Sequence, residues 1–229
     1  MTCTTLDKLR LVYLDAIEIK NKHYLVRDVR TSKCKLLDDS SGKIKVIAEF
    51  DDTKVLSDCL ILVKNKGKMY CTDENGNNIL DNEYDGVYGY NGTFIVGQSI
   101  GGNRVDVYNL KKKSLINSYF SAYVAIYDRL NYFLTRDKIS SLDKLYDENG
   151  KVIIDDKTRL VPLKDKYILS RDIYSDKIKL IDIKKSKVVF DYNSGAKLIR
   201  NRDNTVDLYV VIDGKMKHYE RMAYYKESI

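Results

Sequence analysis

The feature that most constrains the fold is a short motif that returns at nearly constant intervals along the chain. In its clearest form, Lys144–Asp155, two apolar segments flank the turn Asp147-Glu148-Asn149-Gly150. Asn and Gly accept the positive φ angles that a tight hairpin turn requires. The residue that opens the turn recurs at Asp38, Asp73, Asn109, Asp147 and Asp182, in steps of 35, 36, 38 and 35 residues, and a sixth copy follows at Glu220 after 38 more. Recurrence with such a period predicts a repeat architecture.

Each repeat contains three apolar segments before the turn and one after it, which we name strands a, b, c and d in chain order. In strand c, the residues two and four positions before the turn are apolar in most repeats, with Asp143 and His218 as exceptions. This period of two indicates a β-strand with one buried face. No stretch shows a helical period over three turns, so we expect helix to be scarce.

Six four-stranded units cannot each bury a face alone, and packing them radially solves this problem. The sequence therefore predicts an all-β fold: a six-bladed β-propeller of four-stranded antiparallel blades, with residues 1–229 as a single domain. The sixth unit lacks a clear strand d, whereas Leu9–Leu14 resembles a strand d with no unit before it. We expect this N-terminal strand to complete the last blade and close the ring, with 222–229 as a C-terminal tail. The alternative is that residues 222–228 form the missing strand.

Composition limits the function classes. The 229 residues carry a net charge of +7 and a pI near 9.0, which permits an anionic partner without requiring one. No apolar run is long enough to span a membrane, and no apolar signal core follows Met1, so we expect a cytoplasmic protein. The four cysteines have no CxxC or zinc spacing, and they are read as reduced thiols. We expect no cofactor and no metal.

The segments Met69–Asp85 and Lys144–Asp155 resemble the units of the WG-repeat (KWG) family, which run as a strand, an Asp-x-x-Gly-Lys turn, a Val/Ile strand and a Tyr-Asp. The family's defining Trp-Gly is absent, because the chain has no Trp, and Tyr70 or Tyr146 stands near its place. The resemblance implies a repeat β architecture and a binding role. It supplies no catalytic residues.

Three patterns have both a structural and a functional interpretation. The pair Arg-Asp closes strand b in three repeats, at Arg27, Arg136 and Arg171; it is either an ion pair or turn cap, or a ring of guanidinium groups facing an anion. The segment Ser99–Arg104 is either a flexible turn or a phosphate cradle. His23 and His218 are read as satisfied structural histidines rather than as ligands or acid–base groups. The sequence contains no nucleophile, metalloprotease or nucleotide-binding motif.

The connections between strands b and c are longer and more varied than the other turns, and variable loops on a rigid scaffold are where binding concentrates. In an antiparallel blade the b–c and d–a connections share one face. Tyr and Arg on this face are typical interface anchors. The candidate binding residues are Arg30, Lys33, Arg104, Tyr123, Lys138, Arg159 and Tyr174.

Two functions from different classes follow. The first is a non-enzymatic scaffold that binds a protein or another macromolecule through the b–c/d–a face. The second is binding, sequestration or turnover of a small anionic ligand, such as a nucleotide or sugar phosphate, at the mouth of the channel. Nucleic acid is a weaker third option, because basic and acidic residues are interleaved along the chain.

Overall fold

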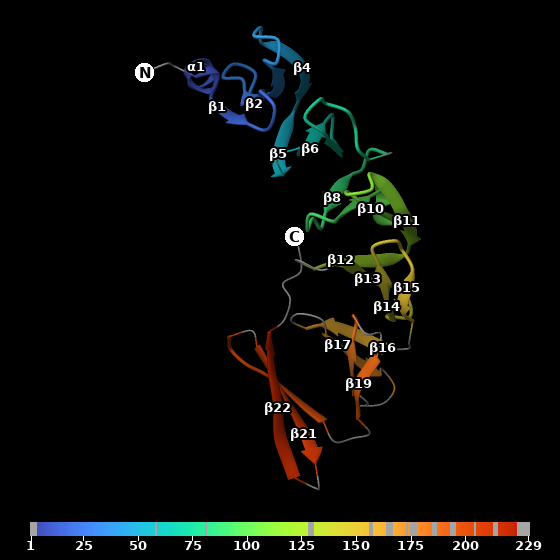
Figure 1. Cartoon of the computed structure of the whole chain (residues 1–229). Coiled ribbons are helices and arrows are strands. Elements are labelled where there is room, and N and C mark those ends of the chain that lie inside the picture. The colour runs from blue at the N-terminus through green and yellow to red at the C-terminus, as the bar shows by residue number, and fades with distance from the viewer. Residues whose placement is uncertain are drawn as a thin grey trace. The chain divides into compact units, whose positions relative to one another are not determined.

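The chain folds into antiparallel β-sheets, with one α-helix among the residues described (Figure 1). The structure, a computed structural model, describes residues 4–57, 59–80, 82–127, 131–155, 158–163, 167–172, 174, 178–184, 187–192, 196–203, 205–212 and 215–223. Its contacts divide the chain into two compact units, Met1–Phe120 and Ser121–Ile229. Each unit is described by itself.

The Met1–Phe120 unit contains three sheets in which each strand pairs with the next along the chain. Sheet A consists of β1 (Asp15–Glu18), β2 (His23–Arg27), β3 (Cys34–Asp38) and β4 (Lys45–Phe50). Sheet B consists of β5 (Asp52–Ser57), β6 (Leu60–Asn65) and β7 (Lys68–Thr72). Sheet C consists of β8 (Gly86–Tyr88), β9 (Phe94–Gln98), β10 (Arg104–Asn109) and β11 (Ser114–Phe120), with the short 3-10 helix η1 (Ile100–Gly102) between β9 and β10.

The Ser121–Ile229 unit repeats the same pattern. Sheet D consists of β12 (Ala122–Ile126), β13 (Tyr132–Asp137), β14 (Asp143–Asp147) and β15 (Val152–Ile154). Sheet E consists of β16 (Thr158–Pro162), β17 (Tyr167–Asp172), β18 (Ile178–Asp182) and β19 (Lys187–Tyr192). Sheet F consists of β20 (Ala196–Arg200), β21 (Thr205–Ile212) and β22 (Lys215–Ala223).

The prediction of an all-β fold built from antiparallel sheets is confirmed. The strands expected as a, b and c occur in every repeat, and strand a of sheet E ends at Pro162 on an edge of the described sheet, where a missing N–H is tolerated. Sheet B has three strands; in place of a strand d, Tyr84 forms an isolated bridge with Met69.

The turn chemistry expected from the repeat is also confirmed. In sheet D the Asp147 carboxylate accepts hydrogen bonds from the backbone N–H groups of Asn149 and Lys151, at 2.8 and 2.9 Å. Gly150 takes a φ of 81° in this turn, and Gly76 takes 79° in the corresponding turn of sheet B. In sheets B and D, the turn after strand c is therefore formed by a capping aspartate followed three residues later by a glycine with positive φ.

The strand predicted over Leu9–Leu14 is wrong, because residues Thr5–Val12 form the α-helix α1. The Thr4 hydroxyl accepts a hydrogen bond from the Asp7 N–H, and the Asp7 carboxylate accepts one from the Thr4 N–H, which is a complete capping box. A helix over these residues provides no strand at 9–14 for the last blade. Residues 224–229, which include most of the alternative closing strand, lie outside the described residues.

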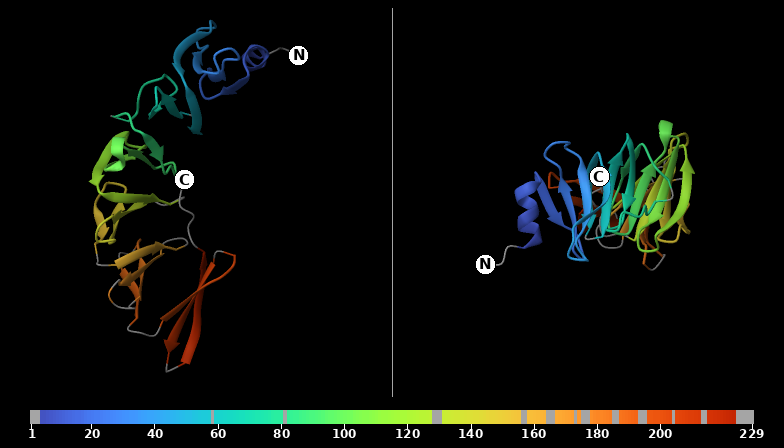
Figure 2. Two further views of the ribbon diagram at one scale, coloured as in Figure 1. Left: turned by 180° about the vertical axis from the view of Figure 1, so that it is seen from behind. Right: turned by 90° about the horizontal axis from the view of Figure 1, so that it is seen from above.

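Sheet A is buried on both faces. On one face Tyr24, Val26 and Leu37 pack with Leu9 of α1, and α1 lies alongside the strands of this sheet in the views from behind and from above (Figure 2). On the other face Leu25 and Leu36 pack against Ile61 and Val63 of sheet B. The helix therefore covers residues on which another sheet would otherwise be able to pack.

Neighbouring sheets within each unit share apolar cores. Leu60 and Cys71 of sheet B join Ile95 and Tyr108 of sheet C. In the second unit, Leu134, Leu145 and Ile154 of sheet D form one cluster with Leu160, Ile168 and Ile181 of sheet E. These shared cores pack sheet A on sheet B, sheet B on sheet C, and sheet D on sheet E.

Candidate functional site

Strand b ends in a fixed loop conformation in several sheets, because an aspartate side chain caps the connection to strand c. The Asp137 carboxylate accepts hydrogen bonds from the N–H groups of Ile139 and Ser140, at 2.9 and 2.6 Å. Asp28 and Asp172 accept from the N–H group two residues ahead in the same way, at 2.9 and 2.7 Å. The Ser140 N–H and hydroxyl hold the pKa of Asp137 below its ordinary value. The aspartates of the Arg-Asp pairs are therefore turn caps.

Two of the three paired arginines are bound to carboxylates, so the structural interpretation of this motif is confirmed for them. Arg27 of sheet A donates to Asp52 of sheet B at 2.7 Å, and this hydrogen bond is the main cause that lowers the pKa of Asp52. Arg136 holds Asp143 by two hydrogen bonds, from Nε at 2.6 Å and from Nη2 at 2.9 Å. Neither guanidinium group is left to face an external anion.

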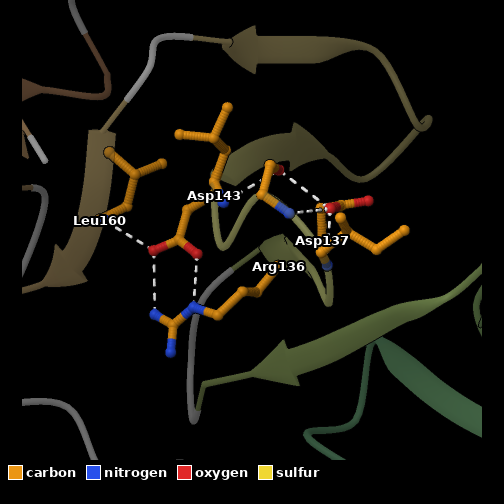
Figure 3. A network of polar contacts seen from close by, with 7 residues as sticks. Arg136, Asp137, Asp143 and Leu160 are labelled. Atoms are coloured by element: carbon orange, nitrogen blue, oxygen red, sulfur yellow. Dashed lines mark hydrogen bonds and ion pairs between the residues drawn. The ribbon is translucent and has the colours of Figure 1, made fainter.

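Asp143 is the centre of a buried network between sheets D and E (Figure 3). Its side chain is fully buried at the start of β14, which explains why it breaks the apolar pattern of strand c. Besides the two bonds from Arg136, its Oδ2 accepts the backbone N–H of Leu160 in β16 at 2.8 Å. A buried carboxylate is tolerated where charged and backbone donors satisfy it. Asp143 thereby fixes the b–c end of sheet D against strand a of sheet E.

A second buried carboxylate, Asp106, joins sheets B and C. It accepts hydrogen bonds from the Tyr84 hydroxyl at 2.7 Å and from Arg104 Nη2 at 2.6 Å. Burial raises the pKa of Asp106, but the hydrogen bonds from Arg104, Ser118 and Tyr84 outweigh burial, so its pKa lies below the ordinary value. The Tyr84 ring packs on Gly97, where an added Cβ would lie only 2.6 Å from the ring. The glycine is needed for this close approach.

These contacts show whether Ser99–Arg104 has free donors for the phosphate cradle considered from the sequence. The positive charge of Arg104 is balanced by Asp106 at 2.6 Å. The N–H of Ser99 donates to the Arg104 carbonyl and the N–H of Gly102 donates to the Ser99 carbonyl, at 3.0 and 2.9 Å. Donors used inside the loop are not free to bind a phosphate, so the geometry does not favour an anion site here.

The structure divides the seven candidate residues between the two units. Arg30, Lys33 and Arg104 belong to the first unit, where Arg30 and Lys33 are exposed in one b–c loop and Lys33 lies 3.5 Å from Glu49. Tyr123, Lys138, Arg159 and Tyr174 belong to the second unit.

The four candidates of the second unit lie at the b–c ends of two packed sheets. The Lys138 ammonium stands 5.1 Å from the centre of the exposed Tyr123 ring, a cation–π distance. The Lys138 N–H also donates to the Ser121 carbonyl at 2.8 Å. In sheet E, Arg159 is opposite Arg171 in the β16–β17 pair, and Tyr174 follows β17 with its ring exposed.

The sequence analysis missed Ile139, which follows Lys138 in the b–c loop of sheet D. Its side chain is 88% exposed, the highest value among the large apolar residues recorded as exposed. Single exposed apolar residues are common, but this one directly follows Lys138, whose ammonium lies over an exposed aromatic ring. The sequence did contain a signal for this exposed residue, because Ile139 is the one apolar residue in the polar segment Asp137-Lys-Ile-Ser-Ser141.

The two histidines have structural partners. His23 is buried, and its Nδ1 lies 3.1 Å from the Lys20 carbonyl and 3.2 Å from the Asn21 carbonyl, so this nitrogen carries the proton. His218 was expected to be buried, but about half of its side chain is exposed; its Nε2 lies 2.9 Å from Asp207. In the part of the chain that the structure describes, no group of three His, Cys, Asp or Glu side chains is arranged to hold a metal ion.

No protein-family model matches the chain, and no curated protein is similar to it. The similarity of two hairpins to WG-repeat units therefore remains a resemblance. Among the described residues, no helix has the length and apolar character needed to cross a bilayer.

Similar solved structures include Hsv2 from Kluyveromyces lactis, with 11% identity over 88% of this chain and 83% of that one and a TM-score of 0.39. The dihydro-heme d1 dehydrogenase NirN in complex with DHE is similar with 15% identity over 90% of this chain and 56% of that one, and a TM-score of 0.37. A chain of the mitotic checkpoint complex matches with 9% identity over 90% and 81% of the two chains, and a TM-score of 0.34. Likenesses at these scores assign neither a family nor a function.

Proposed function

We propose that this protein is a binding scaffold, and that the b–c end of its Ser121–Ile229 unit binds a protein partner. The six sheets are, in this proposal, the blades of a six-bladed propeller. We define the loop surface as Tyr123, Lys138, Ile139, Arg159 and Tyr174. The observations that carry the proposal are the exposed Tyr123–Lys138 cation–π pair and the 88% exposure of Ile139, which follows Lys138 in the chain.

The chemistry of the loop surface fits a protein better than a nucleic acid. Tyr and Arg side chains with an adjacent aliphatic group are the typical energetic centre of a protein interface. Binding of a nucleic-acid backbone would instead require a cluster of free cations. In the loop surface, the Lys138 ammonium already lies on an aromatic ring.

The loop surface is also preorganised. The Asp137 cap fixes the b–c loop of sheet D, and the Asp143 network fixes sheet D to sheet E. A rigid loop loses little conformational entropy on binding, so more of the contact energy appears as affinity.

Affinity capture from an extract of the host tests the proposal when wild type and two variants are compared. Tyr123→Ala/Lys138→Ala/Tyr174→Ala removes the centre of the loop surface. Lys151→Ala/Lys184→Ala removes two exposed lysines from the c–d turns, at the opposite end of the same sheets. We expect a partner that is retained by the wild type and the lysine control and lost by the triple variant.

Two results would count against the proposal. Retention of every partner by the triple variant would exclude the loop surface. Loss of the bound material on nuclease treatment, with an affinity that falls steeply as salt rises, would identify a nucleic acid instead. A cytoplasmic location remains a prediction.

A further inference from the structure

A pocket of about 360 Å³ lies in the Met1–Phe120 unit, at the end of the sheets opposite to the b–c loops. The a–b turn of sheet A contributes Lys20, and the corresponding turn of sheet B contributes Ser57, Cys59 and Leu60. The other walls come from the c–d turns of sheets B and C and from the a–b turn of sheet C. Its volume lies in the range of small-molecule sites.

The floor of the pocket is apolar and belongs to a packed core. It is lined by Leu60, Ile79, Tyr90 and Leu110. Leu60 is buried in the apolar cluster that joins sheets B and C, and the other three are partly buried and pack against that cluster. A floor that is part of a core is held in place by its packing. The pocket is therefore preformed, and Tyr90 supplies an aromatic ring to one wall.

The rim of the pocket carries an excess of positive charge. Lys20, Lys111 and Lys113 are exposed lining residues, and no carboxylate of the described residues forms an ion pair with them. The two acidic lining residues are Asp73 and Glu74, and Asp73 is already used by the N–H groups of Asn75 and Asn77, at 2.9 and 2.8 Å. Among the described lining residues, three lysines thus stand against two carboxylates, one of which is held in the turn that it caps.

We propose that this pocket binds a small molecule with a flat apolar body and one anionic group. The apolar body would lie on the floor against Tyr90, and the anionic group would meet the lysines of the rim. The apolar area supplies affinity, and the charged rim orients the ligand and increases its rate of association. This site differs in unit, position and ligand class from the loop surface.

Three probes separate the two parts of the recognition. Their affinities are measured by isothermal titration calorimetry. The probe 1-naphthyl phosphate has both the flat apolar body and the anionic group, 1-naphthol has only the body, and inorganic phosphate has only the anionic group. We expect 1-naphthyl phosphate to bind at least about tenfold more tightly than either of the others. Failure of 1-naphthyl phosphate to bind, or equal affinity for inorganic phosphate, would overturn the proposal.

Charge removal on the rim gives the matched test. Lys20→Gln/Lys111→Gln removes the two charges but keeps polar side chains, and it should weaken 1-naphthyl phosphate binding by about tenfold. Lys43→Gln/Lys45→Gln removes the same charge from exposed residues that do not line the pocket, and it should leave the affinity unchanged. Equal weakening in both variants would show that only net charge matters, which would overturn the site. The triple variant of the loop surface should bind the probe normally.

Cys59 provides a second measurement that needs no change in the pocket. It is the exposed cysteine of the three described, while Cys34 and Cys71 are buried, and burial raises the pKa of Cys71 to about 12. In a Cys3→Ser background, iodoacetamide should therefore modify Cys59 selectively. Saturating 1-naphthyl phosphate should slow this reaction several-fold, and an unchanged rate would contradict binding in this pocket.

Discussion

At the scale of single residues, buried carboxylates explain how neighbouring sheets are joined. Asp143 breaks the apolar pattern of its strand, whereas Asp106 lies at a position between two apolar ones, and both are fully buried. Each satisfies donors from an element outside its own strand, such as Leu160 for Asp143 and Tyr84 for Asp106. Such residues are costly to truncate, because their partners are left as unpaired buried groups.

We predict that Asp143→Ala lowers the free energy of unfolding by about 3 kcal/mol or more, since Arg136 and the Leu160 N–H both lose their acceptor. The neighbouring Lys144→Ala is the control. Lys144 pairs with Asp155 at 3.0 Å, but both side chains are about half exposed, so its loss should cost less than about 1 kcal/mol. Urea unfolding measures both values. Similar costs for the two variants would contradict the role given to Asp143.

The Asp28 carboxylate gives a prediction about pH. The hydrogen bond from Lys35, followed by those from the Thr31 and Arg30 N–H groups, lowers the pKa of Asp28 in the folded state. Because the pKa of Asp28 is lower in the folded than in the unfolded state, its ionised carboxylate stabilises the fold at pH values above the unfolded pKa of about 3.9. This stabilisation is lost as the pH falls toward the pKa of the folded state. Asp28→Asn keeps the turn cap and removes the charge.

We therefore expect Asp28→Asn to lower the urea midpoint at pH 6 and to bring it closer to the wild-type value as the pH is taken below about 4. The measurement is the urea midpoint of both proteins between pH 2 and pH 7. A difference that stays constant over this range would show that the charge of Asp28 does not contribute.

At the scale of elements, the sequence predicted the strands well because each one repeats a local pattern with a capped turn. It missed α1, because Leu9-Arg-Leu-Val-Tyr-Leu14 is a short, mainly apolar run that leads directly into a strand a, as a strand d would, and the competing signal lies outside that segment in the Thr4–Asp7 capping box. The full networks around Asp143 and Asp106 were not predictable, since the Leu160 N–H and the Tyr84 hydroxyl come from outside the sheets that contain these aspartates.

Leu9 and Leu11 distinguish the helix from the expected strand. In a strand both residues would share one face, whereas in α1 Leu9 is 4% exposed and Leu11 is 84% exposed. We predict that Leu9→Ala lowers the free energy of unfolding by about 2–4 kcal/mol and that Leu11→Ala changes it by less than about 0.5 kcal/mol. Thermal and urea unfolding test this, and equal effects would favour the strand.

At the scale of the whole molecule, repetition explains both the fold and the variety of its surfaces. Each repeat supplies the same packed strands, so the core places few limits on the turns. The b–c loops of the Ser121–Ile229 unit present exposed aromatic and aliphatic groups, whereas the turns at the other end of the Met1–Phe120 unit surround a pocket. One scaffold can thereby support two different binding sites.

Site-specific photo-crosslinking tests the proposed protein-binding surface most directly. The photoreactive amino acid p-benzoylphenylalanine is placed at Ile139, in the loop surface, and separately at Lys151, an exposed turn residue at the opposite end of the same sheet. After irradiation in host cells, we predict a discrete protein adduct from position 139 that is absent from position 151 and is reduced by Tyr123→Ala. No adduct from position 139, or the same adducts from both positions, would contradict the proposal.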